Sequence, residues 1–227
     1  MQGFVELFQQ FDVIGAVKMT LLLSLLSMLG SLILGIIVAV MRVSPIRVLQ
    51  RFAAAWVSLF LNLPLTLIAF FCFFALFLLM GVKLLPGHVT NAQHAVAWGV
   101  MALSIYHSTF VAEAIRSGIN TVPVGQAEAA RAIGLTFGQS LSQVILPQAL
   151  RGAIAPLGNA AIALTKNTTV LATLNVAEMS NVMSFMLDQR IDLMVQIFLL
   201  MSGIFVIMTL PMGILFTRWS KKMAVAR

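Results

Sequence analysis

Charged residues are scarce in this sequence: Asp, Glu, Lys and Arg together make up 9% of its 227 residues. A soluble domain carries about 25% charged and about 45–50% apolar residues. This chain is 60% hydrophobic, and its mean hydropathy is +1.02. We therefore expect lipid to be its main solvent, and the length suits a single membrane domain over residues 1–227.

Cysteine is nearly absent as well. The one cysteine, Cys72, lies in an apolar stretch, so the chain cannot form an internal disulfide and lacks the spacing of a thiolate metal site. The three histidines have no acidic cluster beside them, so we expect this chain to bind neither a metal nor a cofactor. We expect no cleavable signal peptide, because the N-terminal residues include Glu6 and Asp12 and lack a basic region.

Basic residues exceed acidic ones, 14 to 7, which gives a net charge of +7. In a soluble protein that excess would favour nucleic acid as a partner. Here the basic residues form short clusters at the ends of apolar stretches, which is typical of membrane topology signals. We therefore expect membrane lipid and no nucleic acid among the partners.

Uncharged stretches predict an all-α membrane protein with five transmembrane helices. The first, residues 19–41, would be about 35 Å long as a helix, enough to cross a hydrocarbon core of about 30 Å. The second is too long for one perpendicular helix, and Pro64 is the expected place of a bend. The fourth reaches spanning length only if it includes Lys166. The expected spans are 19–41, 52–82, 95–112, 152–177 and 193–217.

The distribution of Lys and Arg predicts the orientation. Five spans place the termini on opposite sides of the membrane, and cytoplasmic loops carry the excess of basic residues. One side would hold Arg42, Arg47, Arg51, Arg116, Arg131, Arg151, Arg218, Lys221, Lys222 and Arg227, and the other Lys18, Lys83 and Arg190. We therefore expect the N-terminus outside, the C-terminus inside, and residues 121–150 in a cytoplasmic loop.

This loop is too polar to span a membrane. Its second half has apolar residues at helical spacing, with Thr136 as an expected N-cap and Pro147 as an expected stop. The apolar positions are Phe137, Leu141, Val144 and Ile145.

A motif in the loop resembles a known family. Residues 125–150 read GQAEAARAIGLTFGQSLSQVILPQAL, which is similar to the EAA loop of ATP-binding-cassette (ABC) importer permeases. FVAEAIRSGINTVPVGQ (110–126) and KNTT (166–169) resemble the versions found in polar amino acid uptake systems. MRVSP (41–45) and IALTKNTT (162–169) are similar to permeases of actinobacterial glutamate importers. The resemblance runs from about Lys18 to the C-terminus.

The resemblance implies a type I ABC importer permease fold in the bacterial cytoplasmic membrane. Its loop would form a coupling helix that docks on a separate ATPase, where Glu128 would meet a basic group. Small alanines suit close seating in a groove, and Gly134 suits a helix C-cap with positive φ. An ordinary interfacial helix is the alternative interpretation. The expected coupling residues are Glu128, Ala129, Ala130, Arg131 and Gly134.

The remaining partners are also implied by the family: a dimer of ABC ATPases, a second permease that is a sister chain or a copy, an extracytoplasmic solute-binding protein, and a polar amino acid substrate. ATP and Mg²⁺ would bind the ATPases. The phosphate-binding loop requires Gly before its Lys, and none of the five lysines here follows a glycine. We therefore expect a transport subunit with no catalytic residues.

Lys166 is the most unusual residue of the expected spans. An ionisable group at membrane depth is unfavourable and usually faces a cavity or a partner. It could meet a substrate carboxylate, with Asn167 and Thr168 bonding other polar groups, or it could snorkel or pair structurally, for example with Glu113. Asn159, about two turns earlier on the same helix, could line the same cavity.

Two further sets of residues are candidates for the pathway. Glu113 and Arg116 are spaced to pair along one helix, either as an anchor above the loop or as a gate. Asn62 and Pro64 could unwind the second span beside the pathway, as in other transporters, or Pro64 could only kink it. Relatives commonly have Arg before this proline, whereas this chain has Leu61-Asn62-Leu63, so either a sister permease supplies the cation or the substrate differs.

The sequence thus predicts alternating-access import of a polar amino acid, glutamate in the first place, with glutamine or aspartate as alternatives. An ion-coupled secondary transporter is the alternative of another class. Such a transporter would usually have more spans and an internal repeat, and it would not need an EAA loop.

Overall fold

The computed structural model describes residues 2–223, and these are helical almost throughout, with no strand. Met1 and residues 224–227 lie outside the described part, and with them Arg227 of the predicted cytoplasmic cluster. The elements are α1 (Gln2–Gln10), α2 (Val13–Val43), α3 (Arg47–Asn62), α4 (Leu65–Phe70), η1 (Phe71–Leu79), α5 (Asn91–Ile119), α6 (Val124–Ala132), α7 (Phe137–Gln139), η2 (Ser140–Ile145), α8 (Leu146–Asn167), η3 (Thr168–Leu174), α9 (Met179–Gln189), η4 (Ile191–Leu193) and α10 (Met194–Met223).

Three to five membrane spans are present by length and composition. Helices α2 and α5 and the segment Ile191–Met223 are each long and apolar enough to cross a membrane. Two bent pairs also qualify if each counts as one span, namely α3 with α4–η1, and the segment Phe137–Leu174 with α9. They fall on the second and fourth of the expected spans.

The second span breaks where proline was expected to bend it. The axes of the two halves differ by 103°, and the chain is extended at Leu63 (φ −90°, ψ 136°). A proline disfavours the α conformation in the residue before it, so the helix ends at Asn62 and restarts after Pro64. The change of direction is therefore a break in the helix rather than a kink.

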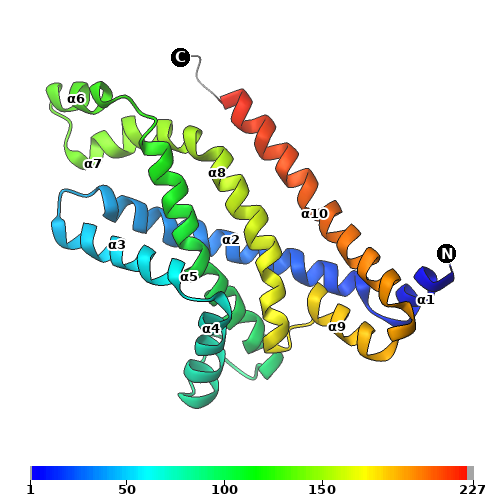
Figure 1. Cartoon of the computed structure of the whole chain (residues 1–227). Helices are drawn as coiled ribbons and strands as arrows, with labels where there is room; N and C mark the ends of the chain where they lie inside the picture. Colours follow the sequence, from blue (N-terminus) through cyan, green and yellow to red (C-terminus); the bar gives the residue numbers. More distant parts are fainter. Residues whose placement is uncertain (1, 224–227) are drawn as a thin grey trace.

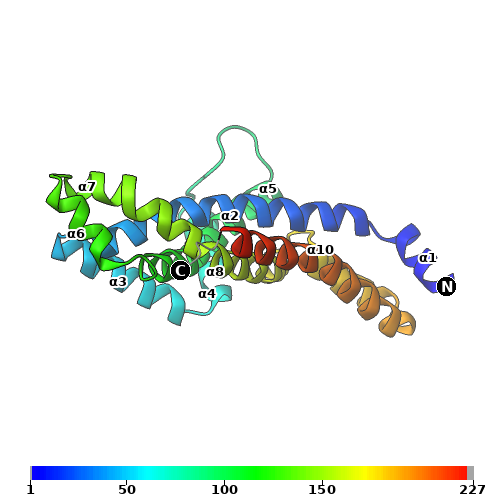
Figure 2. The same cartoon turned by 90° about the horizontal axis from the view of Figure 1, so that it is seen from above.

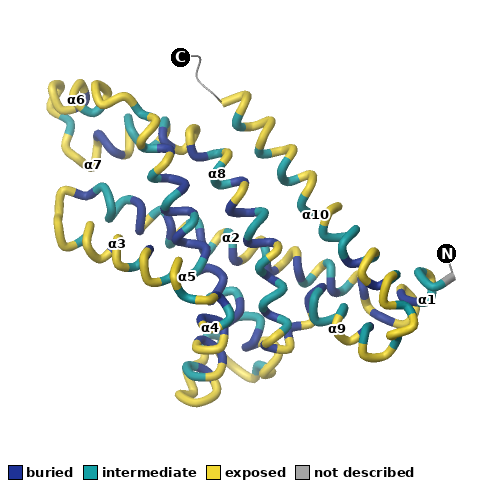
Figure 3. Tube along the Cα trace, in the orientation of Figure 1, coloured by how far each residue is buried: buried dark blue, intermediate teal, exposed yellow. Residues whose placement is uncertain are grey.

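Helix α5 is the centre of the molecule, and its contacts with α2 and α8 form what we call the central seam (Figure 1). Buried residues run along almost the whole of α5 (Figure 3). The seam is close-packed because small residues face it. A Cβ atom built on Gly35 would lie 2.5 Å from the Val111 side chain, and one on Gly118 only 2.1 Å from the Ala149 carbonyl oxygen. Small residues allow such approach between helices in lipid.

Helix α10 is different, because it lies at the edge of the molecule and packs mainly against α8 and α9. Only 11% of its most apolar window is buried. It runs from the end of the molecule that holds α1 toward the end that holds α6 and α7, in both views (Figure 1, Figure 2).

Helices α1 and α9 were not predicted. Arg190, which follows α9, ties both of them to the start of the last span: its guanidinium bonds Asp192 at 2.9 Å, Glu6 at 3.2 Å and Gln10 at 3.1 Å. The hydrogen bonds to Asp192 and Glu6 raise the pKa of Arg190 above its already high value. This network gives α1 a fixed place against the rest of the chain.

The prediction that Pro147 ends a helix was wrong. The π-helical turns of η2 lead directly into α8, and Pro147 stands in the first turn of α8. The missing proline N–H matters least there, and Gln148 Nε2 donates to the Val144 carbonyl oxygen at 2.9 Å. The predicted N-cap is confirmed, since the Thr136 hydroxyl accepts from Gln139 N within a capping box.

Candidate functional site

Helix α6 carries the predicted coupling residues and stands apart from the helical core at one end of the molecule (Figure 1). Glu128, Ala129 and Arg131 are exposed, whereas Ala130 is buried. Arg131 Nε donates to the Ala127 carbonyl oxygen at 3.2 Å, so its side chain lies along its own helix. The Glu128 carboxylate makes no ion pair among residues 2–223 and remains available to another molecule.

A sharp turn ends α6, and Gly134 makes it possible. Gly134 has φ +86°, as its predicted role as a C-cap required. Its N–H donates to Arg131 O at 3.0 Å, and Leu135 N donates to Ala130 O at 3.1 Å. These two bonds form a Schellman motif, which fixes the direction of α6 relative to the helix that follows.

Apolar side chains flank the exposed carboxylate of Glu128. Val124 at the start of α6 is 72% exposed, and Ile133 just after its end is 78% exposed. Interaction sites for other proteins typically combine exposed apolar side chains with polar groups at their rim. The end of the molecule that carries α6 therefore has the features of a docking surface.

Glu113 on α5 joins two helices of the central seam. It forms ion pairs with Arg42 of α2 and with Arg116, whose Nη2 lies 2.7 Å from the Glu113 carboxylate. The sequence predicted the pair with Arg116 but not the one with Arg42. It also left open a pair between Glu113 and Lys166, and this pair does not form. The cluster locks the ends of α2 and α5 together near the start of the α6 loop.

Helix α8 presents an uncovered polar face. Asn159 and Lys166 are exposed and lie two turns apart, with the small residue Ala155 exposed along the same side. Lys166 takes part in none of the four ion pairs of residues 2–223. A cation and an amide on the outside of a membrane helix require a polar partner or a water-filled space.

The two residues after Lys166 point elsewhere. Asn167 is partly buried, and its Nδ2 lies 3.1 Å from Nε2 of His107 on α5. Thr168 is fully buried and donates its hydroxyl to the Thr165 carbonyl oxygen at 2.8 Å. The structure thus places Lys166 and Asn159 on the open face and Thr168 within the protein, with Asn167 between them.

His107 is the residue near this face that sequence reasoning left out. It is fully buried, its ring packs against Tyr106 and Phe110, and its Nδ1 has no partner within the described chain. The sequence signal for it was only a histidine inside an apolar span. The pairing with Asn167 depends on the relative rotation of α5 and α8, which no local pattern specifies.

Asn62 lies at the break of the second span, separate from the face of α8. It is exposed, and its side chain donates to the Ser58 carbonyl oxygen at 2.6 Å. That bond folds the side chain back onto the last turn of its own helix. Within residues 2–223 no group of three or more His, Cys, Asp or Glu side chains could hold a metal ion.

Comparison with known proteins identifies the class. Residues 31–225 match the family described as binding-protein-dependent transport system inner membrane component. Because the match covers most of the chain, the chain belongs to this family, and it is a transport component rather than an enzyme. A permease of this fold implies an ATPase and a substrate-binding protein as partners.

Two individual relatives are named for the amino acid that they transport. The chain is 40% identical over 210 residues to the glutamate transport system permease protein GluC of Corynebacterium glutamicum, covering 92% of each chain. It is 37% identical over 196 residues to the probable glutamine ABC transporter permease protein GlnM of Bacillus subtilis, covering 86% of this chain and 85% of that one.

Solved structures agree on the fold. A crystal structure of an amino acid ABC transporter with histidines matches 98% of this chain and 96% of its own, with a TM-score of 0.79 and 26% identity. An inward-facing MetNI methionine ABC transporter matches 94% and 96%, with a TM-score of 0.70 and 19% identity. The predicted all-α ABC importer permease fold is therefore confirmed.

Proposed function

We propose that this chain is the permease subunit of an ATP-driven importer that moves a polar amino acid, glutamate, into the cell. The observation that carries the proposal is the 40% identity to a glutamate transport permease, which extends over 92% of both chains. A second glutamate transport permease, from Corynebacterium efficiens, is 41% identical over the same share.

The proposed topology has five spans, with the N-terminus outside and the C-terminus inside. Each bent pair then counts as one span. The positive-inside rule supports this orientation, because nine of the ten basic residues of the predicted cytoplasmic side are described, eight of them at or near the ends of spans and Arg131 on α6 in the loop between two spans. The end of α10 also points toward the end of the molecule that carries α6 (Figure 1).

Helix α6 is proposed to dock on one ATPase of a dimer that binds ATP and Mg²⁺. Its exposed Glu128 would pair with a cation in the partner, while Val124 and Ile133 would lose their contact with water. The Schellman turn at Gly134 would transmit the movement of α6 to the helical segments that follow it, α7, η2 and α8. Closure of the ATPases thereby reaches the membrane part of the permease.

The translocation pathway is proposed to run along the polar face of α8, between this chain and a second permease that is a copy or a sister chain. Leaving Lys166 and Asn159 in lipid would be unfavourable, and a facing permease would enclose them. Lys166 would attract the carboxylate of a substrate delivered by the extracytoplasmic binding protein. The ion pairs of Glu113 with Arg42 and Arg116 are proposed to anchor the ends of α2 and α5 and to act as a gate.

The test is uptake of radiolabelled glutamate into proteoliposomes that hold the whole complex, with ATP inside and the binding protein outside. We expect uptake that requires ATP and is competed best by glutamate or aspartate. Competition by glutamine alone would retain the mechanism and replace glutamate as the substrate. Glutamine is the second candidate substrate because the chain is 37% identical to a probable glutamine permease. Uptake driven by an ion gradient without ATP would overturn the proposal.

A further inference from the structure

Helix α1 is too short to cross a membrane, yet it carries apolar side chains on its surface. Its 9 residues form a helix about 14 Å long, whereas a membrane span needs about 20 residues. The Val5 side is 55% exposed and Phe8 is 47% exposed. The rest of the described chain thus leaves these two residues half uncovered.

Three kinds of residue occupy three different sides of α1. At 3.6 residues per turn, Phe4, Phe8 and Val5 fall within about 100° of one another. The polar side comes next and consists of Gln9, Glu6 and Gln10, and the packed side consists of Gly3 and Leu7. Apolar and polar residues are more sharply segregated in α1 than in α2, α5 or α10. Such segregation is typical of a helix that lies in a membrane surface.

Contacts on two of these sides fix the rotation of α1. On the packed side Leu7 is fully buried, and a Cβ atom on Gly3 would lie 3.2 Å from the Leu193 side chain. On the polar side the Glu6 carboxylate accepts a hydrogen bond from Arg190 at 3.2 Å. The third side, with Val5 and Phe8, is therefore exposed in a defined direction.

The surroundings of α1 place it at the edge of the membrane. The helix breaks at Asp12, which caps α2, so α1 does not continue the first span. In both views α1 lies at the end of the molecule where α2 and α10 begin (Figure 1, Figure 2). The first exposed side chains of these two spans include Ile14 and Val195, each 61% exposed. The apolar side of α1 thus adjoins spans whose exposed residues suit lipid.

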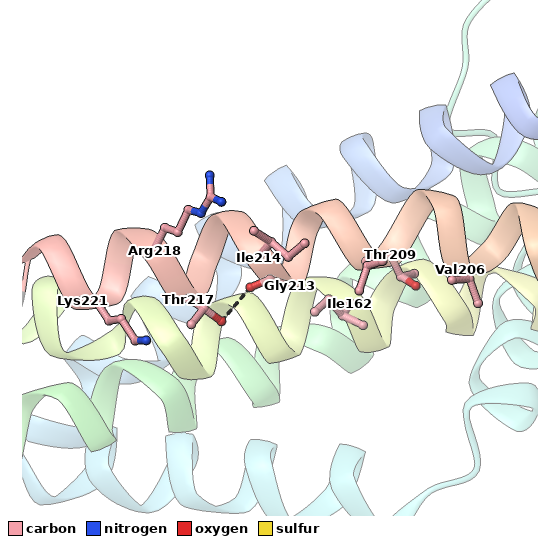
Figure 4. A pocket seen from close by; sticks show the side chains of 9 residues that line it. Ile162, Val206, Thr209, Gly213, Ile214, Thr217, Arg218 and Lys221 are labelled. Atoms are coloured by element: carbon pink, nitrogen blue, oxygen red, sulfur yellow. Dashed lines mark hydrogen bonds between the residues drawn. The ribbon is translucent and has the colours of Figure 1, made fainter.

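The second permease is proposed to face another part of the molecule. On that side a groove between α8 and α10 is lined by Ile162 and by residues of α10 from Val206 to Lys221 (Figure 4). Helix α1 approaches α10 at Gln196, and from there to Val206 the helix rises about 15 Å. The exposed side of α1 therefore lies away from the residues that the second permease would enclose.

We propose that α1 is an interfacial helix whose exposed apolar side, with Val5 and Phe8, lies in lipid at the boundary between headgroups and acyl chains. Helices of this kind lie along the membrane surface with their apolar side buried by about 5–10 Å. Glu6 would remain among headgroups and water, where it pairs with Arg190. The choice of the outer leaflet rests on the proposed orientation, whereas the contact with lipid does not.

This position of α1 would have a structural consequence. Arg190 pairs both with Glu6 of α1 and with Asp192 at the start of the last span. A helix held in the membrane surface would therefore keep the start of α10 at a fixed depth.

The test measures the depth of a spin label, so it does not depend on which substrate is carried. Phe8→Cys is labelled with a nitroxide in the whole importer complex, reconstituted in lipid. Its collision rates are measured with molecular oxygen, which concentrates in hydrocarbon, and with a nickel chelate, which stays in water. We expect the ratio of the oxygen rate to the nickel rate to be at least about fivefold higher than for a label on the polar side of α1.

Gln9→Cys provides that matched label, because Gln9 is the next residue, is exposed like Phe8 and lies on the polar side. Cys72, the one cysteine of the sequence, is 3% exposed. The complex without an introduced cysteine gives the background signal, which is subtracted.

Two results would overturn the proposal. Equal ratios at Phe8→Cys and Gln9→Cys would show that both sides of α1 lie in the same medium. Low collision rates with both reagents at Phe8→Cys would show that a protein covers this side. Val5→Cys lies on the same side of α1 and repeats the measurement if a label in place of Phe8 disturbs folding. It should give the ratio expected for Phe8→Cys.

Discussion

The central seam and the exposed face of α8 contain similar residue types but obtain their partners in different ways. In the seam, Ser31 donates to the Ser27 carbonyl oxygen at 2.7 Å, and Asn167 Nδ2 of α8 lies 3.1 Å from His107 Nε2 of α5. On the face of α8, Lys166 and Asn159 have no such partner within residues 2–223 and remain exposed. Small and polar residues thus line both surfaces, but within this chain only those of the seam are buried or partly buried.

The difference shows how to interpret polarity in a membrane helix. Polar groups in lipid need hydrogen-bond partners, so a polar face that the chain does not cover indicates another molecule. The same reasoning applies to the exposed carboxylate of Glu128 on α6, outside the spans. Substitutions that overpack the seam should therefore damage folding, and substitutions on the open surfaces should damage transport while the protein still folds.

Gly118→Leu is expected to have the largest effect, because it overpacks the seam where α5 and α8 approach each other closely. A Cβ atom there would lie 2.1 Å from the backbone carbonyl oxygen of Ala149, and backbone cannot rotate away as a flexible side chain can. Overpacking a close-packed site costs about 1–3 kcal/mol and occasionally more. We expect little monodisperse protein after purification and a lower melting temperature.

Gly203→Leu on α10 is the matched control, since a Cβ atom at Gly203 would meet nothing within 4 Å. Its yield and melting temperature should remain close to those of the unmodified chain. If both variants behave alike, the close packing of α5 against α8 is not what holds the molecule together.

Glu128→Arg is expected to abolish ATP-dependent uptake while the permease folds normally. The side chain is exposed and makes no ion pair within the described chain, so reversing its charge should not disturb the fold. It should place two like charges together in the docked complex, which is strongly unfavourable. Uptake in proteoliposomes and co-purification of the ATPase are the measurements.

Gln143→Arg introduces the same cationic side chain at an exposed position of η2 outside α6, and it should leave uptake within about twofold of normal, the level expected when no close charge pair is disturbed. Normal uptake with Glu128→Arg would contradict the coupling role of α6 and favour the alternative of an interfacial helix.

The sequence predicted the helical class and the main landmarks because these depend on local chemistry. Hydropathy placed the apolar segments, Pro64 marked the break, and Gly134 and Thr136 were recognised as caps, since each acts through its own backbone or that of its neighbours. The number of spans is the part of the fold that remains a proposal, because both bent pairs pass the length test only when their halves are added together.

Features that depend on contacts between distant segments could not be predicted. The Arg42–Glu113 pair joins residues 71 positions apart in the chain, and the pair between Arg190 and Glu6 joins residues 184 positions apart. Pro147 was misassigned because proline ends a helix in most contexts, whereas π-helical turns before it allow the helix to continue. For the candidate site, the sequence found Lys166 but not the bond between His107 and Asn167.

Lys166→Ala tests the open face and should have a smaller effect than loss of coupling. A hydrogen bond to a charged group contributes about 1.5–3 kcal/mol, which corresponds to roughly a tenfold to hundredfold change in affinity. We expect glutamate uptake to need a higher substrate concentration, with ATPase co-purification unchanged. Thr173→Ala, at an exposed position of η3, should leave the kinetics unaltered. Unchanged kinetics in Lys166→Ala would make this lysine a structural residue that snorkels.

The smallest effect is expected for His107→Leu, because His107 belongs to the seam and reaches the open face only through Asn167. The change fills the buried position with an apolar side chain and removes the partner that lies 3.1 Å from the Asn167 amide. A neutral hydrogen bond contributes about 0.5–1.5 kcal/mol, so the apparent KM for uptake should rise roughly twofold to tenfold while the melting temperature changes little. His94→Leu is the control, since His94 is also buried in α5 but packs against Phe77. An equal rise in KM for both variants would show that burial of a histidine, rather than its bond to Asn167, is what transport requires.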